Sequence, residues 1–356
     1  MEGAIPKIAD DWQVRQADSG VVLLDVLAAV PAGLVGVHAD VVRLDLDGRF
    51  AEVNLRPDDD QRERGVARVG GVERRDRRMT SAGAERFEIP GTGSRVIRGE
   101  VRLPPNPVGS VVLLHGFKGF ARFAFFPYLA EQLAAVGLTA VTFNFSGSGV
   151  GDDLETFDDP DAFAENTYTR ESQDVSLVVA EAERRGWTGP QFGLFGHSRG
   201  GAIALLHASR DARVGALATW SSIASVRRWS DAQTEEWRTR GYLEVPNTRT
   251  GQTLRVSTAL LDETEEHALG RLNLKLAAAT LLCPWLIVHG AADETVPFAE
   301  GEQLAEASEA RAELVNVAGA THTFNVAHGM TTPSPQLREA AERTVGFFVS
   351  RLAKRS

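Results

Sequence analysis

The fold of this chain is decided by residues 191–206, which read QFGLFGHSRGGAIALL. The first part of this stretch is apolar enough for a buried strand, and the last part has the composition of a buried helix. A strand that turns so sharply into a helix needs Gly196 and Gly200 to lack side chains. The turn would hold Ser198 in a strained backbone conformation with its hydroxyl projecting outward, where the start of the helix favours a developing negative charge.

The sequence around this stretch predicts the α/β class. From Glu85 onward, short β-branched or leucine-rich runs alternate with longer segments of helical period, which indicates a mostly parallel central sheet with helices on both faces. We expect strands near residues 95–103, 110–115, 139–144, 191–196, 214–220, 285–290 and 311–317. We expect helices over 125–136, 170–185, 199–209, 298–308 and 336–352.

Three regions are expected along the chain. Residues 1–80 end in a stretch dense in charge, from Arg62 to Arg78, and we interpret them as a flexible or weakly ordered extension, or as preceding a physiological start at Met79. Residues 81–356 form the predicted α/β domain. Within it, an insertion at about 225–279 is too long for an ordinary connection and is expected to cap the carboxyl ends of the strands.

A serine hydroxyl is a poor nucleophile near neutral pH and needs a histidine base, which an acid in turn orients. Asp293 lies in the loop after the predicted strand at 285–290, and His322 lies in a loop of small residues after the next strand. Both loops are expected at the same edge of the sheet as Ser198. The rivals Glu294 and His328 are less suited, because Glu294 would face away from its neighbour and His328 lies deeper in its loop.

The same reasoning predicts two backbone donors for an oxyanion. One is the amide of Arg199, which follows the serine directly. The other is the amide of Phe117, in the loop after the apolar run 111–114, where Gly116 lets the backbone turn.

Taken together, these motifs resemble the α/β-hydrolase superfamily over about residues 85–353. His-Gly-Phe-x-Gly at 115–119, Gly-His-Ser-x-Gly-Gly at 196–201 and the two downstream loops are most similar to its dienelactone-hydrolase-like, feruloyl-esterase-like and serine-peptidase-like branch. The resemblance implies acyl transfer to water through an acyl-enzyme, without cofactor or metal. Dienelactone hydrolases use a cysteine nucleophile where this chain has Ser198, so lactone chemistry does not carry over.

The substrate is less well indicated than the reaction. Aromatic side chains gather in the segments expected around the site, and we predict that Phe120, Trp220, Trp229 and Phe324 line a pocket for an aryl or medium-length acyl group. Among the nearby cations, Lys118, Arg122 and Arg199 are candidates to bind a substrate carboxylate.

A serine hydrolase of carboxylic esters is therefore the leading prediction, acting on a small ester or acyl substrate. An aminopeptidase or acyl-peptide hydrolase would need an acidic site for the substrate amine, for which Glu235, Glu236 and Glu244 are available. A thioesterase would favour basic residues at the cleft mouth. A catalytically silent binding protein would have no need of the full set of catalytic residues.

The composition limits which binding partners and which cellular compartment are expected. With a formal net charge of −10 and a single cysteine, Cys283, the sequence predicts neither nucleic-acid binding nor a disulfide. The early apolar stretch 21–37 contains Asp25 and Pro31, which argues against a membrane span, and the acidic N-terminus is unlike a secretory signal. We therefore expect a cytoplasmic protein, and the sequence leaves a homodimer open.

Overall fold

A nine-stranded sheet forms the centre of the domain in the computed structural model, which describes residues 43–44, 50–51, 79–80, 83–247 and 251–353. Its strands lie in the order β13-β12-β9-β8-β6-β7-β5-β4-β3. The first six are parallel to one another, and the last three are antiparallel additions at one edge. The strands are β3 (Met79–Thr80), β4 (Ala84–Pro90), β5 (Val96–Arg102), β6 (Gly109–Leu114), β7 (Leu138–Asn144), β8 (Phe192–His197), β9 (Val214–Trp220), β12 (Trp285–Gly290) and β13 (Ala312–Val317).

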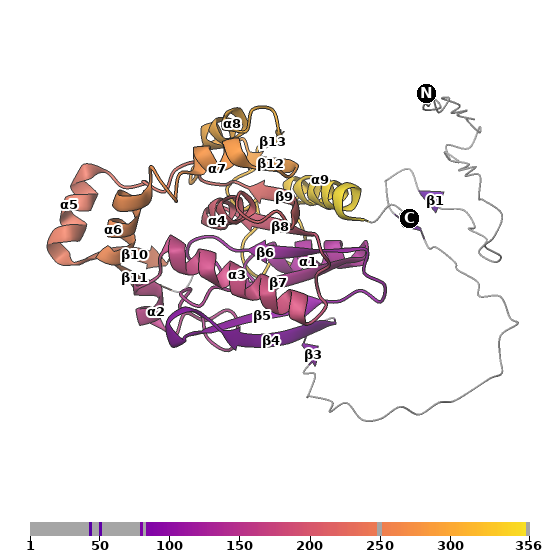
Figure 1. The fold of residues 1–356 in the computed structure, drawn as a ribbon, viewed down its shortest axis with the longest axis horizontal. Helices are drawn as coiled ribbons and strands as arrows, with labels where there is room; N and C mark the ends of the chain where they lie inside the picture. The colour runs from indigo at the N-terminus through magenta and orange to yellow at the C-terminus, as the bar shows by residue number, and fades with distance from the viewer. Residues whose placement is uncertain (1–42, 45–49, 52–78, 81–82, 248–250, 354–356) are drawn as a thin grey trace, which may run out of the picture. The chain divides into compact units, whose positions relative to one another are not determined.

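Helices cover both faces of this sheet, as the sequence predicted (Figure 1). On one face lie α1 (Phe126–Ala135) and α9 (Pro335–Leu352), which contact each other. On the other lie α3 (Tyr168–Arg184), α4 (Arg199–Ala208) and α8 (Phe298–Ala307), with α7 (Leu274–Thr280) packed between α4 and α8. The α/β class is confirmed.

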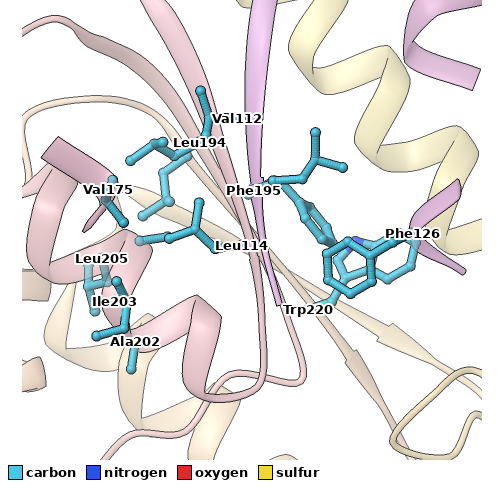
Figure 2. Close-up of a cluster of buried hydrophobic side chains, with 14 of the residues drawn as sticks. Val112, Leu114, Phe126, Val175, Leu194, Phe195, Ala202, Ile203, Leu205 and Trp220 are labelled. Atoms are coloured by element: carbon cyan, nitrogen blue, oxygen red, sulfur yellow. The ribbon is translucent and has the colours of Figure 1, made fainter. Parts of the chain in front are cut away.

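The two hydrophobic layers follow from the alternation of side chains along each strand. Figure 2 shows Leu194 among the aliphatic side chains of β6 and α4, whereas its neighbour Phe195 lies with aromatic rings on the opposite side. The ring of Phe195 packs edge-on against Trp220, with centroids 5.1 Å apart. Because both faces are buried, the central strands are apolar throughout rather than alternating with polar residues.

The insertion between β9 and β12 adds its own buried side chains to the hydrophobic core of the domain. It contains α5 (Asp231–Arg240), the antiparallel pair β10 (Tyr242–Asn247) and β11 (Gln252–Ser257), and α6 (Thr258–His267), which gather at one end of the domain (Figure 1). Trp237 is fully buried there and donates its indole N–H to the Val256 carbonyl at 2.9 Å. Glu263 of α6 attaches the insertion to the domain, because its carboxylate accepts the amides of Tyr168 and Thr169 at the start of α3.

The predicted elements agree closely with the structure, with some additions. All seven expected strands and all five expected helices are present, with ends that differ by at most two residues. The sequence did not predict β4, the short helix α2 (Pro160–Ala164) or the elements inside the insertion. The last helix of the expected insertion, α7, packs on α4 and α8.

Little of the N-terminal region can be compared with its prediction. In residues 1–73 the structure describes the two-residue strands β1 (Arg43–Leu44) and β2 (Phe50–Ala51), which pair antiparallel. Met79 and Thr80, at the end of the predicted extension, form β3, which pairs antiparallel with β4. The other residues of the extension lie outside the described residues. Within the part of the chain that is described, no helix is long and apolar enough to cross a membrane.

Candidate active site

Ser198 occupies the turn between β8 and α4, at the carboxyl edge of the sheet. Its backbone angles, φ 57° and ψ −123°, are strained for a residue with a side chain, and such strain is typical of functional positions. The turn is also very tight. A Cβ on Gly196 would lie 2.2 Å from the Gly200 carbonyl oxygen, and a Cβ on Gly200 would lie 2.4 Å from that of His115. Both positions therefore require glycine, because the neighbouring backbone leaves no room for a side chain.

Asp293 and His322 contact each other as the sequence predicted. The Nδ1–H of His322 donates to Asp293 Oδ2 at 2.8 Å, and the amides of Thr295 and Val296 donate to Oδ1 at 2.9 Å each. Burial tends to raise the pKa of Asp293, but the hydrogen bond and charge of His322 outweigh it, so this pKa is lowered. The carboxylate thus stays ionised and fixes the His322 tautomer, which leaves Nε2 as a proton acceptor.

The histidine loop is held in place by His197, the residue before the serine. His197 Nε2 lies 2.9 Å from the backbone carbonyl of His322, which can only accept, so Nε2 carries the proton. Burial, together with nearby His322, lowers the pKa of His197 to about 3, so the ring is neutral at physiological pH. His289 similarly braces the Asp293 loop, through Nε2 and the Val296 carbonyl at 2.8 Å.

The two predicted oxyanion donors are also near Ser198. Gly116 approaches it so closely that a Cβ there would lie 2.9 Å from the Ser198 Cβ, which brings the backbone of the Phe117 loop against the serine. Arg199 is the first residue of α4, where the amide has no partner within the helix. The backbone at Gly116 and the first turn of α4 therefore both lie against Ser198, whose side chain is at the positive end of that helix.

A family model described as the alpha/beta hydrolase family matches residues 111–333, a range that begins in β6 and includes Ser198, Asp293 and His322. The chain belongs to this family. It has the α/β-hydrolase fold.

Individual relatives of this chain are distant. It is 26% identical over 239 residues to the 2,6-dihydropseudooxynicotine hydrolase of Paenarthrobacter nicotinovorans, a match that covers 66% of this chain. The matched part spans 58% of the length of that relative.

Solved structures share the fold. Est1E from Butyrivibrio proteoclasticus with ferulic acid bound has a TM-score of 0.58 and 19% identity, over 75% of this chain and all of Est1E. An esterase domain from Rhodothermus marinus has a TM-score of 0.54 and 17% identity, over 76% of this chain and 99% of that domain.

Ser198 and His322 line a cavity of about 380 Å³. It lies where the strand order reverses, between β6 and β8, which is where open α/β sheets bind ligands. The residues that line it fall into two sets. The strand-end set comes from loops after β6, β8, β12 and β13 and comprises Gly116, Phe117, Lys118, Gly119, Phe123, His197, Ser198, Thr295, Val296, His322 and Thr323. The cap set comes from α3, the Arg199 side chain and the insertion, with Tyr168, Arg199, Ile223, Arg228, Trp229 and Asn247.

The predicted pocket residues are only partly found in this cavity. Trp229 lines it. The structure corrects the other three, because Phe120, Trp220 and Phe324 are buried side chains of the core and are not among the lining residues. Trp220 and Phe324 pack against each other with ring centroids 4.7 Å apart, and the Trp220 indole donates to Thr344.

The three candidate cations do not all lie at the cavity. Lys118 and Arg199 line the cavity, but Arg122 pairs with the buried Glu100 outside it. Of the rejected rivals, Glu294 is exposed and His328 pairs with Glu155 at 3.4 Å. In the described part of the chain, no cluster of His, Cys, Asp or Glu is arranged to hold a metal ion.

Sequence reasoning missed most of the cap set. Tyr168 begins α3, and its ring lies 4.1 Å below the guanidinium of Arg199. Arg199 Nε donates to Glu171 at 2.9 Å, and both side chains are buried. Burial opposes the Arg199 charge, but the charge of Glu171 outweighs it and raises the pKa of Arg199. A buried Arg–Glu pair with an aromatic ring is thus built beside the nucleophile, and only the position of Arg199 in the motif pointed to it.

Proposed function

We propose that this hydrolase cleaves carboxylic esters through an acyl-enzyme on Ser198. The observation that carries the proposal is the Asp293–His322 hydrogen bond, which leaves His322 Nε2 as a base in the cavity that Ser198 lines. Two fold relatives of this chain are an esterase domain and a protein with ferulic acid bound, which is consistent with ester chemistry.

The proposed reaction has two stages. His322 Nε2 takes the proton of the Ser198 hydroxyl while Oγ attacks the ester carbonyl, and the amides of Phe117 and Arg199 stabilise the oxyanion. The intermediate collapses, the alcohol leaves with the proton from His322, and an acyl-enzyme remains. Water then gives a proton to His322, attacks the acyl carbon and releases the acid and the free serine.

Charge favours esters over peptides with a free amine. An aminopeptidase needs a carboxylate for the substrate ammonium, whereas none of the described residues that line the cavity is Asp or Glu. The three candidate acids of the insertion, Glu235, Glu236 and Glu244, are exposed and outside the lining. The cavity is at the lower end of the size range of ligand pockets, so short and medium acyl groups should be preferred.

The test is hydrolysis of p-nitrophenyl esters from acetate to decanoate, alongside amino-acyl p-nitroanilides, by the wild type and by Ser198→Ala. We expect ester turnover that falls by about 10⁴-fold to 10⁶-fold in the variant, because the nucleophile is lost. Ser176→Ala, which removes an exposed hydroxyl from α3, is the matched control and should retain the rate. Faster cleavage of the anilides would favour the peptidase, and a folded wild type without ester turnover would overturn the proposal.

A further inference from the structure

Two buried hydrogen-bond donors of the cap set have no partner among the residues that the structure describes. They are Nη2 of Arg199 and Nδ2 of Asn247. Their residues are only 5% and 2% exposed, and both line the cavity that contains Ser198. Leaving a buried donor unpaired costs about 1–3 kcal/mol, so two of them at one cavity call for an explanation.

Their surroundings hold both groups in position. The Arg199 guanidinium is fixed by the Glu171 carboxylate and lies over the rings of Tyr168 and Phe117, 4.1 and 5.7 Å from their centroids. Both rings line the same cavity. Packing and the ion pair therefore restrain the guanidinium while leaving Nη2 unused.

Asn247 comes from a different part of the chain and is held in place by contacts of the backbone around it. It ends β10, and its carbonyl accepts the amide of Gly251 at 2.9 Å. The preceding carbonyl, of Pro246, accepts a hydrogen bond from Lys118 at 3.0 Å, which ties this end of the insertion to the loop of Phe117. The Asn247 carboxamide is thus placed beside the oxyanion loop by contacts that do not use its Nδ2.

We infer that Arg199 Nη2 and Asn247 Nδ2 form a subsite for an oxygen acceptor of the substrate, separate from the oxyanion donors. The inference rests on the proposed function and narrows its substrate class to esters that carry a second, uncharged carbonyl oxygen. The acceptor is neutral because Glu171 already balances Arg199, with Nε and Oε2 only 2.9 Å apart. A carboxylate would add a second negative charge to a buried pair, at high desolvation cost. Arg228 is similarly balanced by Glu300 at 2.8 Å.

The first experiment measures binding, so that it does not depend on turnover. Ser198→Ala is titrated calorimetrically with aryl esters of 4-oxopentanoate, 5-oxohexanoate and 6-oxoheptanoate, each against the methyl-branched acyl ester of the same length. Aryl hemisuccinate and aryl hemiglutarate are the matched compounds that carry a carboxylate instead of the oxo group. A second series places the oxo group in the alcohol, using 4-oxopentyl and 4-methylpentyl butyrate.

In at least one series the oxo compound should bind about tenfold more tightly than its branched partner, as expected for one to two hydrogen bonds from buried donors. Introducing Asn247→Leu or Arg199→Lys should bring that ratio close to one. The matched control Asn316→Leu changes an exposed asparagine of β13 outside the cavity and should retain the ratio. Melting temperatures of all variants separate lost binding from lost folding.

The outcomes separate this inference from the proposed function. Equal binding of oxo and branched compounds in both series would overturn the subsite, even if the wild type hydrolyses simple esters. Tighter binding of the carboxylates would overturn the neutral substrate class. Oxo-selective binding without ester turnover by the wild type would support the subsite and overturn the ester hydrolase.

Discussion

The strand-end set and the cap set line one cavity, but they are positioned by different kinds of contact. Ser198 is held by the glycines of its own motif, and Asp293 accepts the amides of residues two and three positions further on. The cap set depends on contacts between distant segments, such as Lys118 with Pro246 and Tyr168 with Glu263. The nucleophile turn and the Asp293 loop are thus shaped by local contacts, and only the His322 loop needs the distant His197. The cap set is assembled by long-range packing throughout.

The largest expected effect concerns the strand-end set and tests whether Asp293 orients His322. Asp293→Asn should lower kcat for a p-nitrophenyl ester by about 10⁴-fold with little change in KM, because an amide that donates to His322 favours the wrong tautomer. Steady-state kinetics measure the change. Glu294→Gln, at the exposed neighbouring position, is the control and should stay within twofold. A loss below tenfold in Asp293→Asn would mean that another group orients His322.

The contrast explains how much of the site the sequence could predict. The loops of Phe117, Ser198, Asp293 and His322 each follow a strand whose apolar run is visible in the sequence, so their common edge could be predicted. Strand ends were accurate for the same reason. The family match and the nine-stranded sheet confirm the α/β-hydrolase fold.

Pocket residues could not be predicted in this way. An aromatic residue after a strand can point into the core or into the cavity, and only packing decides. Trp220 is fully buried by Phe125, Phe195 and Phe324, whereas Trp229, from the insertion, lines the cavity. Asn247 carried no sequence signal, because its importance comes from the position of β10. Strand β4, next to the short edge strand β3, was missed because polar residues interrupt its few apolar ones.

An intermediate effect tests whether the cap set depends on its buried ion pair. Glu171→Gln keeps the shape of the side chain but leaves the Arg199 charge buried without a counter-ion, so the free energy of unfolding should fall by about 3 kcal/mol. Chemical denaturation at neutral pH measures it. Glu181→Gln on the same helix is the control, because Glu181 pairs with Arg184 and Arg185 near the surface, where such pairs contribute at most about 1 kcal/mol.

Equal losses in the two variants would show that the Arg199–Glu171 pair is no more important than a surface pair. The same variant also bears on the neutral substrate class. With Glu171 uncharged, Arg199 gains an unbalanced positive charge, so the preference for oxo over carboxylate compounds should fall in Glu171→Gln.

The smallest expected effect concerns His197, which connects the nucleophile turn to the histidine loop. Its pKa is lowered to about 3 in the folded protein, from 6.5 in the unfolded chain. Between these values the unfolded chain binds the additional proton, so His197 makes stability fall as the pH falls, by up to about 1.4 kcal/mol per pH unit. The contribution is fully present above pH 6.5.

His197→Gln removes this titration and retains an amide N–H in place of Nε2–H for the His322 carbonyl. Urea denaturation of the wild type and the variant at several pH values between 4 and 6 gives the two slopes of unfolding free energy against pH. We expect the wild-type slope to be steeper by about 1 kcal/mol per pH unit. Parallel slopes would mean that His197 takes up its proton in the folded state over this range. The contact between the Ser198 turn and the His322 loop would then tolerate a charge on His197, and pH would not distinguish the two sets of contacts.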